Sequence, residues 1–549
     1  MRLIVVLCAL SVAMTSAQTA DMRTRAEISN YEETSTYADV MRVIDGLVAT
    51  SPLVHTESFG KTEEGRDLPL MVISDPKVST PAAARKLGRP LVFVQANIHA
   101  GEVEGKEAVL MLARRLVSGD LRPLTRQLVI LIAPDYNADG NEKVNVMNRT
   151  AQNGPIAGVG TRENSKGLDL NRDYMKLDSA EARSLVGAFN KWDPHVIVDL
   201  HTTNGSYHAN HLTYAPILNP NVDARLIDFT RDRMLAPIRQ AMQKNHHWRT
   251  YYYGNFAPED GGGRESSRVD PANPGNVSWR TFDHRPRFGN NYAGLRNRIA
   301  ILSEAYSYLD FKGRVEVTED FVEEIWRNAA ANAKQIMTLT AQADRVFTAS
   351  NPKPIDLGLE FEIRALPEKV EILVGDVTKV PNPRSGREML TMAPLAAPVM
   401  MSDYGVFAAT RSVMMPKGWL IPKNTADNGR LAAALDRLRW HGIKIEELTA
   451  DAVVAVERFS IADITRAPKP FQGHQEARLK GAFDKAQLTV QPGSLYIPAN
   501  QPLARLAFYL LEPESDDGLV TWNIIEEGLS AGLTYPIYRV TSDARLKTR

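Results

Sequence analysis

Apolar segments of strand length alternate with segments of helical periodicity over the first 350 residues. Leu91–Ala96 is a nearly continuous apolar run, which is typical of a strand buried on both faces. Gly105–Val117 follows with apolar residues at helical spacing, and Leu128–Ala133 is a second apolar strand. Strand, helix and strand in this order predict a parallel sheet covered by helices.

The alternation continues to about residue 345 and then stops. Its further members are the strands Leu68–Ile73, His195–Leu200 and Ile299–Ser303 and the helices Thr36–Val48, Ser179–Phe189, Arg225–Lys244 and Glu319–Ala343. Beyond about residue 350 prolines punctuate short strand-like stretches, namely Val370–Val374, Gly405–Ala409, Ala452–Phe459, Gln487–Val490 and Leu503–Leu511, with one helix, Ala426–Trp440. We expect an α/β domain over residues 18–350 and a smaller β-rich or α+β accessory domain of unknown role over residues 351–549.

Residues 1–17 have the layout of a secretory signal peptide, with an apolar run, Leu3–Met14, too short to span a bilayer. Cleavage after Ala17 would remove Cys8, the chain's single cysteine, so any metal site must use His, Asp or Glu. Lys plus Arg and Asp plus Glu each number 65, so no net positive field favours a nucleic acid. We expect a periplasmic or secreted protein with no stable membrane insertion after cleavage.

Metal-ligating side chains follow two of the buried strands. His99 and Glu102 lie three residues apart just after the strand Leu91–Ala96, and His201 directly follows the strand His195–Leu200. The carboxyl ends of parallel strands meet at one edge of a sheet, where ligands of open α/β sheets bind. Two imidazoles and one carboxylate suit zinc and leave a fourth position for water, as in catalytic sites. Asp199 is a candidate for orienting a metal-ligating side chain through a hydrogen bond, without contacting the metal itself.

Two further motifs belong to the same pattern. In the stretch Gly167–Asp173, Arg172 offers a planar fork of donors suited to a carboxylate. Glu304 follows the apolar strand Ile299–Ser303, where burial would raise its pKa into the range of a general base.

The order and spacing of these motifs resemble the zinc carboxypeptidase family, peptidase family M14. The resemblance covers roughly residues 30–345. It implies an α/β/α fold with a mixed, largely parallel sheet, and one zinc ion per chain held by His99, Glu102 and His201. It also implies a metallocarboxypeptidase that hydrolyses the C-terminal bond of peptides.

The resemblance assigns roles to the surrounding residues as well. Asn171 and Arg172 would grip the free C-terminal carboxylate of a peptide substrate. Glu304 would take a proton from the zinc-activated water and return it to the leaving amine.

Other positions leave alternatives open. Arg149 is the best match to the family's carbonyl-polarising arginine, with Arg162 as a rival, and Tyr292 matches a substrate-capping tyrosine. The stretch Asp199–Thr203 also resembles the aspartoacylase and succinylglutamate desuccinylase relatives, which cleave N-acyl amino acids. A peptide-binding protein without turnover is the third reading.

Overall fold

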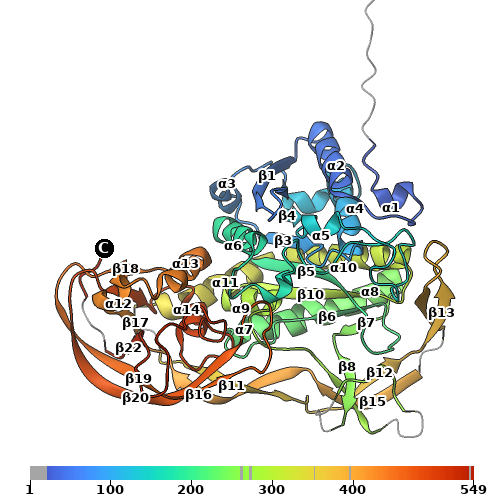
Figure 1. Ribbon diagram of the computed structural model, residues 1–549. Helices are drawn as coiled ribbons and strands as arrows, with labels where there is room; N and C mark the ends of the chain where they lie inside the picture. Colours follow the sequence, from blue (N-terminus) through green and yellow to red (C-terminus); the bar gives the residue numbers. More distant parts are fainter. Residues whose placement is uncertain (1–20, 260–263, 271–274, 351–352, 395–396, 543–545) are drawn as a thin grey trace, which may run out of the picture.

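Figure 1 shows the computed structural model of the protein, which describes residues 21–259, 264–270, 275–350, 353–394, 397–542 and 546–549. The expected signal peptide, residues 1–17, lies outside these ranges. Within them, no helix is long and apolar enough to cross a membrane.

An eight-stranded mixed sheet forms the centre of the larger body. Its order is β1 (Val54–Lys61), β2 (Asp67–Ile73), β4 (Val129–Ala133), β3 (Leu91–Ala96), β5 (Val196–Thr203), β10 (Ile299–Tyr306), β6 (Leu212–Ala215) and β7 (Thr250–Tyr252). The inner strands β4, β3, β5 and β10 are parallel, whereas β1, β2 and β6 bring antiparallel pairings. Every residue of β3 and β4 is buried, as their unbroken apolar runs predict.

Helices cover both faces of this sheet. Phe93 of β3 packs against Phe189 of α6 (Ala180–Trp192), with ring centroids 5.3 Å apart. Ala96, which points to the other face, lies beside Gly105 of α4 (Glu104–Ser118). A Cβ atom at Gly105 would lie 2.8 Å from the Leu200 side chain, so glycine permits the close approach of α4. The expected α/β fold with a mixed sheet is confirmed.

The remaining helices of this body surround the sheet. They are α1 (Arg25–Ile28), α2 (Tyr37–Thr50), α3 (Pro81–Lys86), α5 (Ala138–Asn141), α7 (Ala224–Asp228), α8 (Ala236–His246), α9 (Gly289–Leu295), α10 (Phe311–Ala331) and α11 (Ala333–Thr348). Thr36 and Asp39 form a capping box that begins α2. The expected helix Arg225–Lys244 consists of α7, a π-helical segment (Phe229–Leu235) and α8.

The C-terminal region is built mostly from strands, as expected. Its main sheet has the order β18 (Glu446–Glu447), β21 (Leu495–Pro498), β17 (Gly418–Ile421), β22 (Tyr538–Val540), β19 (Ala452–Arg466) and β20 (Ala477–Val490). Smaller pairings join β11 (Asp356–Arg364) to β16 (Val406–Met414), and β13 (Val377–Pro381) to β14 (Glu388–Met392). A four-stranded sheet contains β12 (Val370–Val374), β15 (Ala397–Tyr404), β9 (Val277–Arg280) and β8 (Asn255–Pro258). Strands from before and after residue 350 therefore share one sheet.

Two sequence predictions in this region are wrong in detail. Leu503–Leu511 was expected as a strand but forms the helix α14 (Ala504–Leu511), every residue of which is buried. Arg505 is the only charged residue of this short segment and is itself buried, so the segment has no solvent-exposed polar face and periodicity cannot distinguish a buried helix from a buried strand. The expected helix Ala426–Trp440 is divided into α12 (Lys423–Asp427) and α13 (Ala432–His441).

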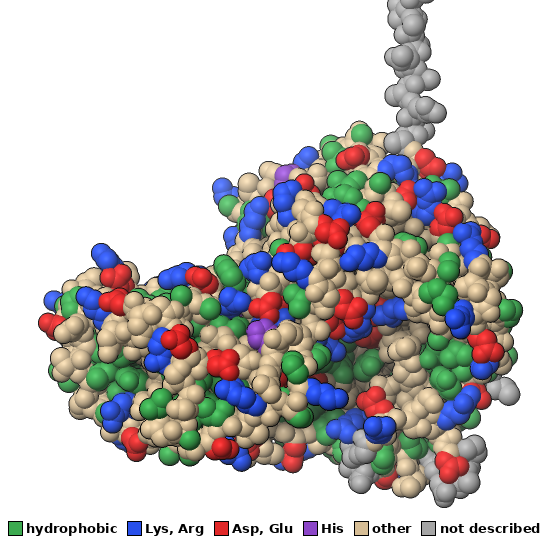
Figure 2. Space-filling view, in the orientation of Figure 1, with side chains coloured by type: hydrophobic (Ala, Val, Ile, Leu, Met, Phe, Trp, Pro, Cys, Tyr) green, Lys and Arg blue, Asp and Glu red, His purple; other side chains and the backbone are tan. Residues whose placement is uncertain are grey.

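The C-terminal sheet forms a lobe beside the larger body, at the left of Figure 1. Figure 2 shows basic and acidic side chains interspersed over the visible face of both parts. This distribution agrees with equal numbers of acidic and basic residues in the chain.

Candidate metal centre

The structure brings the candidate ligands to one edge of the sheet. After β3 the chain turns at Asn97, whose φ of +63° is left-handed, a conformation that asparagine tolerates better than most residues. This turn leads to His99 and Glu102. His201 lies on β5 and is the register partner of Glu304 on the parallel strand β10. Pairing of β3 with β5 and of β5 with β10 thus brings these four side chains together.

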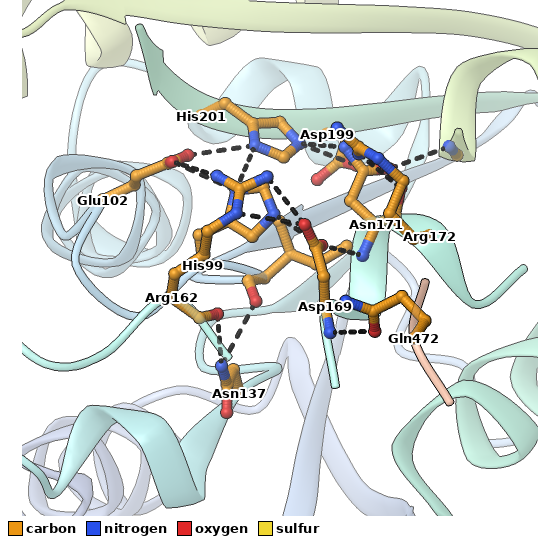
Figure 3. Close-up of polar contacts among 12 residues, drawn as sticks. His99, Glu102, Asn137, Arg162, Asp169, Asn171, Arg172, Asp199, His201 and Gln472 are labelled. Carbon is orange, nitrogen blue, oxygen red and sulfur yellow. Dashed lines mark hydrogen bonds and ion pairs between the residues drawn. The ribbon is translucent and has the colours of Figure 1, made fainter. Parts of the chain in front are cut away.

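Three donor groups converge on one point (Figure 3). The Nδ1 atom of His99 lies 3.0 Å from Oε1 of Glu102, and Nδ1 of His201 lies 3.0 Å from Oε2 of Glu102. The two Nδ1 atoms are 3.2 Å apart. All three side chains are buried, and they form a cluster able to hold a metal ion.

A carboxylate contacts the Nε2 atom of each imidazole, on the side away from the cluster of donor atoms. Asp169 Oδ1 is hydrogen-bonded to Nε2 of His99 at 3.0 Å, and Asp199 Oδ2 lies 3.1 Å from Nε2 of His201. A carboxylate at Nε2 favours the proton on that nitrogen and directs the Nδ1 lone pair toward the other ligands. Burial alone would lower the pKa of His201, but Asp199 and Glu102 raise it well above its ordinary value.

The geometry of this donor set fits zinc. Tetrahedral bonds of about 2.0 Å separate neighbouring ligand atoms by about 3.3 Å, close to the observed spacings. Burial alone would raise the pKa of Glu102, but His99 and Arg149 hold it well below the ordinary value, so this candidate ligand is an ionised carboxylate. The anionic ligand is also fixed by the backbone N–H of Thr202, which donates to it at 3.0 Å.

Glu304 faces the same centre. Burial raises the pKa of Glu304 to about 8; His201 opposes this shift and Glu102 adds to it. A carboxylate in such surroundings is a stronger base than an exposed glutamate.

Two arginines contact the candidate metal ligands: Arg149 contacts Glu102, and Arg162 lies close to His99. Arg149 donates from Nη2 to Glu102 Oε1 at 2.5 Å, and a Cβ atom at Gly101 would lie 2.6 Å from its Nε. Arg162 is held by Asp169 Oδ2 through Nε and Nη2, at 3.0 and 2.8 Å, while its Nη1 lies 3.2 Å from Nδ1 of His99. Arg162 and Glu304 line the same cavity, and the positive charge of Arg162 opposes the rise in the pKa of Glu304.

Asn171 and Arg172 lie on the short 3-10 helix η2 (Leu170–Arg172). The guanidinium of Arg172 stacks on the Phe288 ring, 4.1 Å from its centroid, and donates to the carbonyl oxygen of Asn171. Among the described residues it has no carboxylate within ion-pair distance. Burial lowers the pKa of Arg172, although Asp169 opposes the shift. A half-buried cation without an acidic partner is suited to an anionic ligand that enters the cavity.

These groups line one cavity of about 670 Å³. Its walls include His99, Glu102, Arg149, Arg162, Asn171, Arg172, His201, Tyr253, Asp283, Phe288 and Glu304. Sequence reasoning missed Tyr253 and Asp283, because nothing in their local pattern separates them from other loop residues. The position of Asp169, two residues before Asn171, was visible in the sequence but was given no role.

Tyr292 is not brought to the cavity. It is fully buried on α9, where its hydroxyl lies 2.9 Å from Nδ1 of His441 and accepts from Arg296. Since His441 belongs to the C-terminal region, the sequence pattern could not show this partner. The expectation of a substrate-capping role for Tyr292 is therefore corrected.

Comparisons with known proteins agree with the motifs. Residues 40–197 match the Peptidase_M14 zinc carboxypeptidase family. Carboxypeptidase 2 of Trichophyton rubrum is 24% identical over 521 residues, which are 90% of this chain and 84% of that protein. Carboxypeptidase Z of Homo sapiens is 33% identical over 150 residues, 26% of this chain and 22% of that one. A putative carboxypeptidase A from Shewanella denitrificans aligns with a TM-score of 0.39 and 19% identity, over 55% of this chain and 69% of that one.

The predicted relationship to the zinc carboxypeptidase family is thereby confirmed, and the chain is a metallocarboxypeptidase. The family match includes His99, Glu102, Asn171 and Arg172 and ends before His201 and Glu304.

Proposed function

We propose that this enzyme removes single residues from the C-termini of peptides, with one zinc ion bound by His99, Glu102 and His201. The observation that carries the proposal is the convergence of these donor atoms, within 4.8 Å of one another, in a cavity that also contains Glu304 and Arg172. Zinc at this position would lower the pKa of a bound water toward about 7 and polarise the scissile carbonyl.

The chain's own residues supply the proton transfer and the orientation. Glu304 accepts the proton of the attacking water on its carboxylate and then delivers it to the nitrogen of the leaving amine. Arg172 and Asn171 hold the substrate's terminal carboxylate, which selects the last peptide bond for attack.

We infer that Arg162 polarises the carbonyl and that Arg149 holds Glu102. The Arg162 fork is fixed by two hydrogen bonds to Asp169, and its third nitrogen points toward the metal ligands. Arg149 instead makes its contact with Glu102 itself.

The test combines metal analysis with mass-spectrometric digestion of a peptide library, using wild type and Glu304→Gln. We expect about one zinc per chain in both proteins and release of single C-terminal residues by wild type alone. A chelated sample with zinc restored serves as the control. Hydrolysis confined to N-acyl amino acids, or a protein without zinc, would refute the proposal.

We also propose that the protein is exported to the periplasm or beyond, and that residues 351–549 form an accessory domain. Support for export comes from the signal-like sequence of residues 1–17. N-terminal sequencing of the protein from fractionated cells tests it: we expect Gln18 as the first residue, and an intact N-terminus in the cytoplasmic fraction would contradict it.

A further inference from the structure

One loop of the C-terminal region reaches the metal centre. This tip loop, residues 467–476, joins the long strands β19 and β20. Oε1 of Gln472 accepts a hydrogen bond of 2.8 Å from the backbone N–H of Asp169, as Figure 3 shows. The two residues are 303 positions apart in the sequence.

The conformation of Gln472 is unusual for its residue type. Gln472 and Gly473 have φ angles of +51° and +80°, and Phe471 and His474 exchange both backbone hydrogen bonds, at 2.7 and 3.0 Å. Such a two-residue hairpin turn needs left-handed backbone at both central positions, which favours Asn or Gly at the first. Glutamine is less suited to this turn than asparagine, but its side chain is one methylene longer. The residue type therefore fits the contact with Asp169 better than it fits the turn.

Asp169 orients several groups of the site at once. Its Oδ1 is hydrogen-bonded to Nε2 of His99 and accepts from the N–H of Asn171, and its Oδ2 accepts from Arg162. It is also the N-terminal cap of η2, which carries Arg172. A displacement of the Asp169 backbone would thus move Arg172, and it would also move the Asp169 carboxylate that contacts His99.

Other residues of the tip loop also contact segments close to the site. Nε2 of His474 lies 2.7 Å from Oδ2 of Asp178, and Arg287 donates to Glu476 at 2.6 Å. Arg287 immediately precedes Phe288, the ring on which Arg172 stacks. Two polar contacts made by residues just after Gln472 thus tie the loop to segments flanking the site.

We propose that Gln472 is a positioning residue of the catalytic centre, through which the C-terminal region fixes the Asp169–Arg172 turn and so sets affinity for the substrate carboxylate. This inference rests on the proposed carboxypeptidase function. It gives the C-terminal region a role in substrate binding.

The test compares Gln472→Asn and Gln472→Gly with the control Gln475→Asn. Both Gln472 variants suit the left-handed turn and lose the contact, while Gln475 is an exposed residue of the same loop that donates to Ala467. For a peptide with a free C-terminus we expect KM to rise about three- to tenfold with little change in kcat, as for the loss of one hydrogen bond. Hydrogen–deuterium exchange of the peptide containing Asp169–Arg172 should become faster. The control should change neither quantity.

Each outcome decides the matter. If KM is unchanged in both Gln472 variants, the proposal is overturned, whether exchange is faster or not, because faster exchange alone marks a purely structural contact. A fall in kcat with unchanged KM also overturns it. Failure of the proposed function is distinguishable, since wild type itself would then release no C-terminal residues; the inference falls with it.

Discussion

The proposed contact between Arg172 and the substrate's terminal carboxylate allows the sharpest prediction. The half-buried guanidinium of Arg172 lies 4.1 Å from the centroid of the Phe288 ring and has no acidic partner within ion-pair distance among the described residues, so its charge is available to a ligand. Two unit charges 4 Å apart attract by about 4 kcal/mol at an effective dielectric constant of 20, before the cost of removing the substrate carboxylate from water. Net values for hydrogen bonds to charged groups are about 1.5–3 kcal/mol, which corresponds to about a 10- to 150-fold preference.

The assay is a double-mutant cycle between enzyme and substrate. Wild type and Arg172→Met are each tested on one peptide with a free C-terminal carboxylate and on the same peptide as its C-terminal amide, and kcat/KM is measured by mass spectrometry. Methionine keeps an unbranched side chain over Phe288 while removing the charge. We expect wild type to prefer the acid by about 10- to 150-fold and the variant to lose most of this preference. An equal preference in both enzymes would falsify the assignment of Arg172.

Three further predictions concern other parts of the molecule. Arg162→Gln should lower kcat by about 100-fold or more while Arg149→Gln affects it less, because we assign Arg162 to the developing oxyanion; equal losses in steady-state kinetics would contradict this. Asp169→Asn should weaken zinc binding about 10- to 100-fold, since Asp169 orients His99, and competition with a chelator measures it. An unchanged affinity would count against that role. Burial raises the pKa of Asp403 to about 6 despite nearby Arg231, so folding loses up to about 3 kcal/mol as pH rises from about 4 to above 6. Asp403→Asn should therefore raise the melting temperature at pH 7.5 and lose this advantage near pH 4; equal melting temperatures at pH 7.5 would oppose the argument.

The sequence determined the central sheet and the approximate place of the site. Leu91–Ala96 was predicted with the bounds that the structure shows, because a strand buried on both faces requires an unbroken apolar run. His99, Glu102, His201 and Glu304 could be placed at one sheet edge in advance, since each follows or lies near the carboxyl end of one of the strands β3, β5 and β10, which run parallel to one another. These features are local, and chain order together with strand direction suffices to relate them.

Only the tertiary structure decided contacts between segments distant in the sequence. The burial of Tyr292 against His441 and the contact of Gln472 with Asp169 join the two regions of the chain, and no local pattern records such partners. The helix Ala504–Leu511 was missed for a related reason: every residue is buried, so its surroundings rather than its periodicity select the backbone conformation. The local sequence pattern specifies which residues become buried, whereas packing between distant segments determines which residues they contact in the interior.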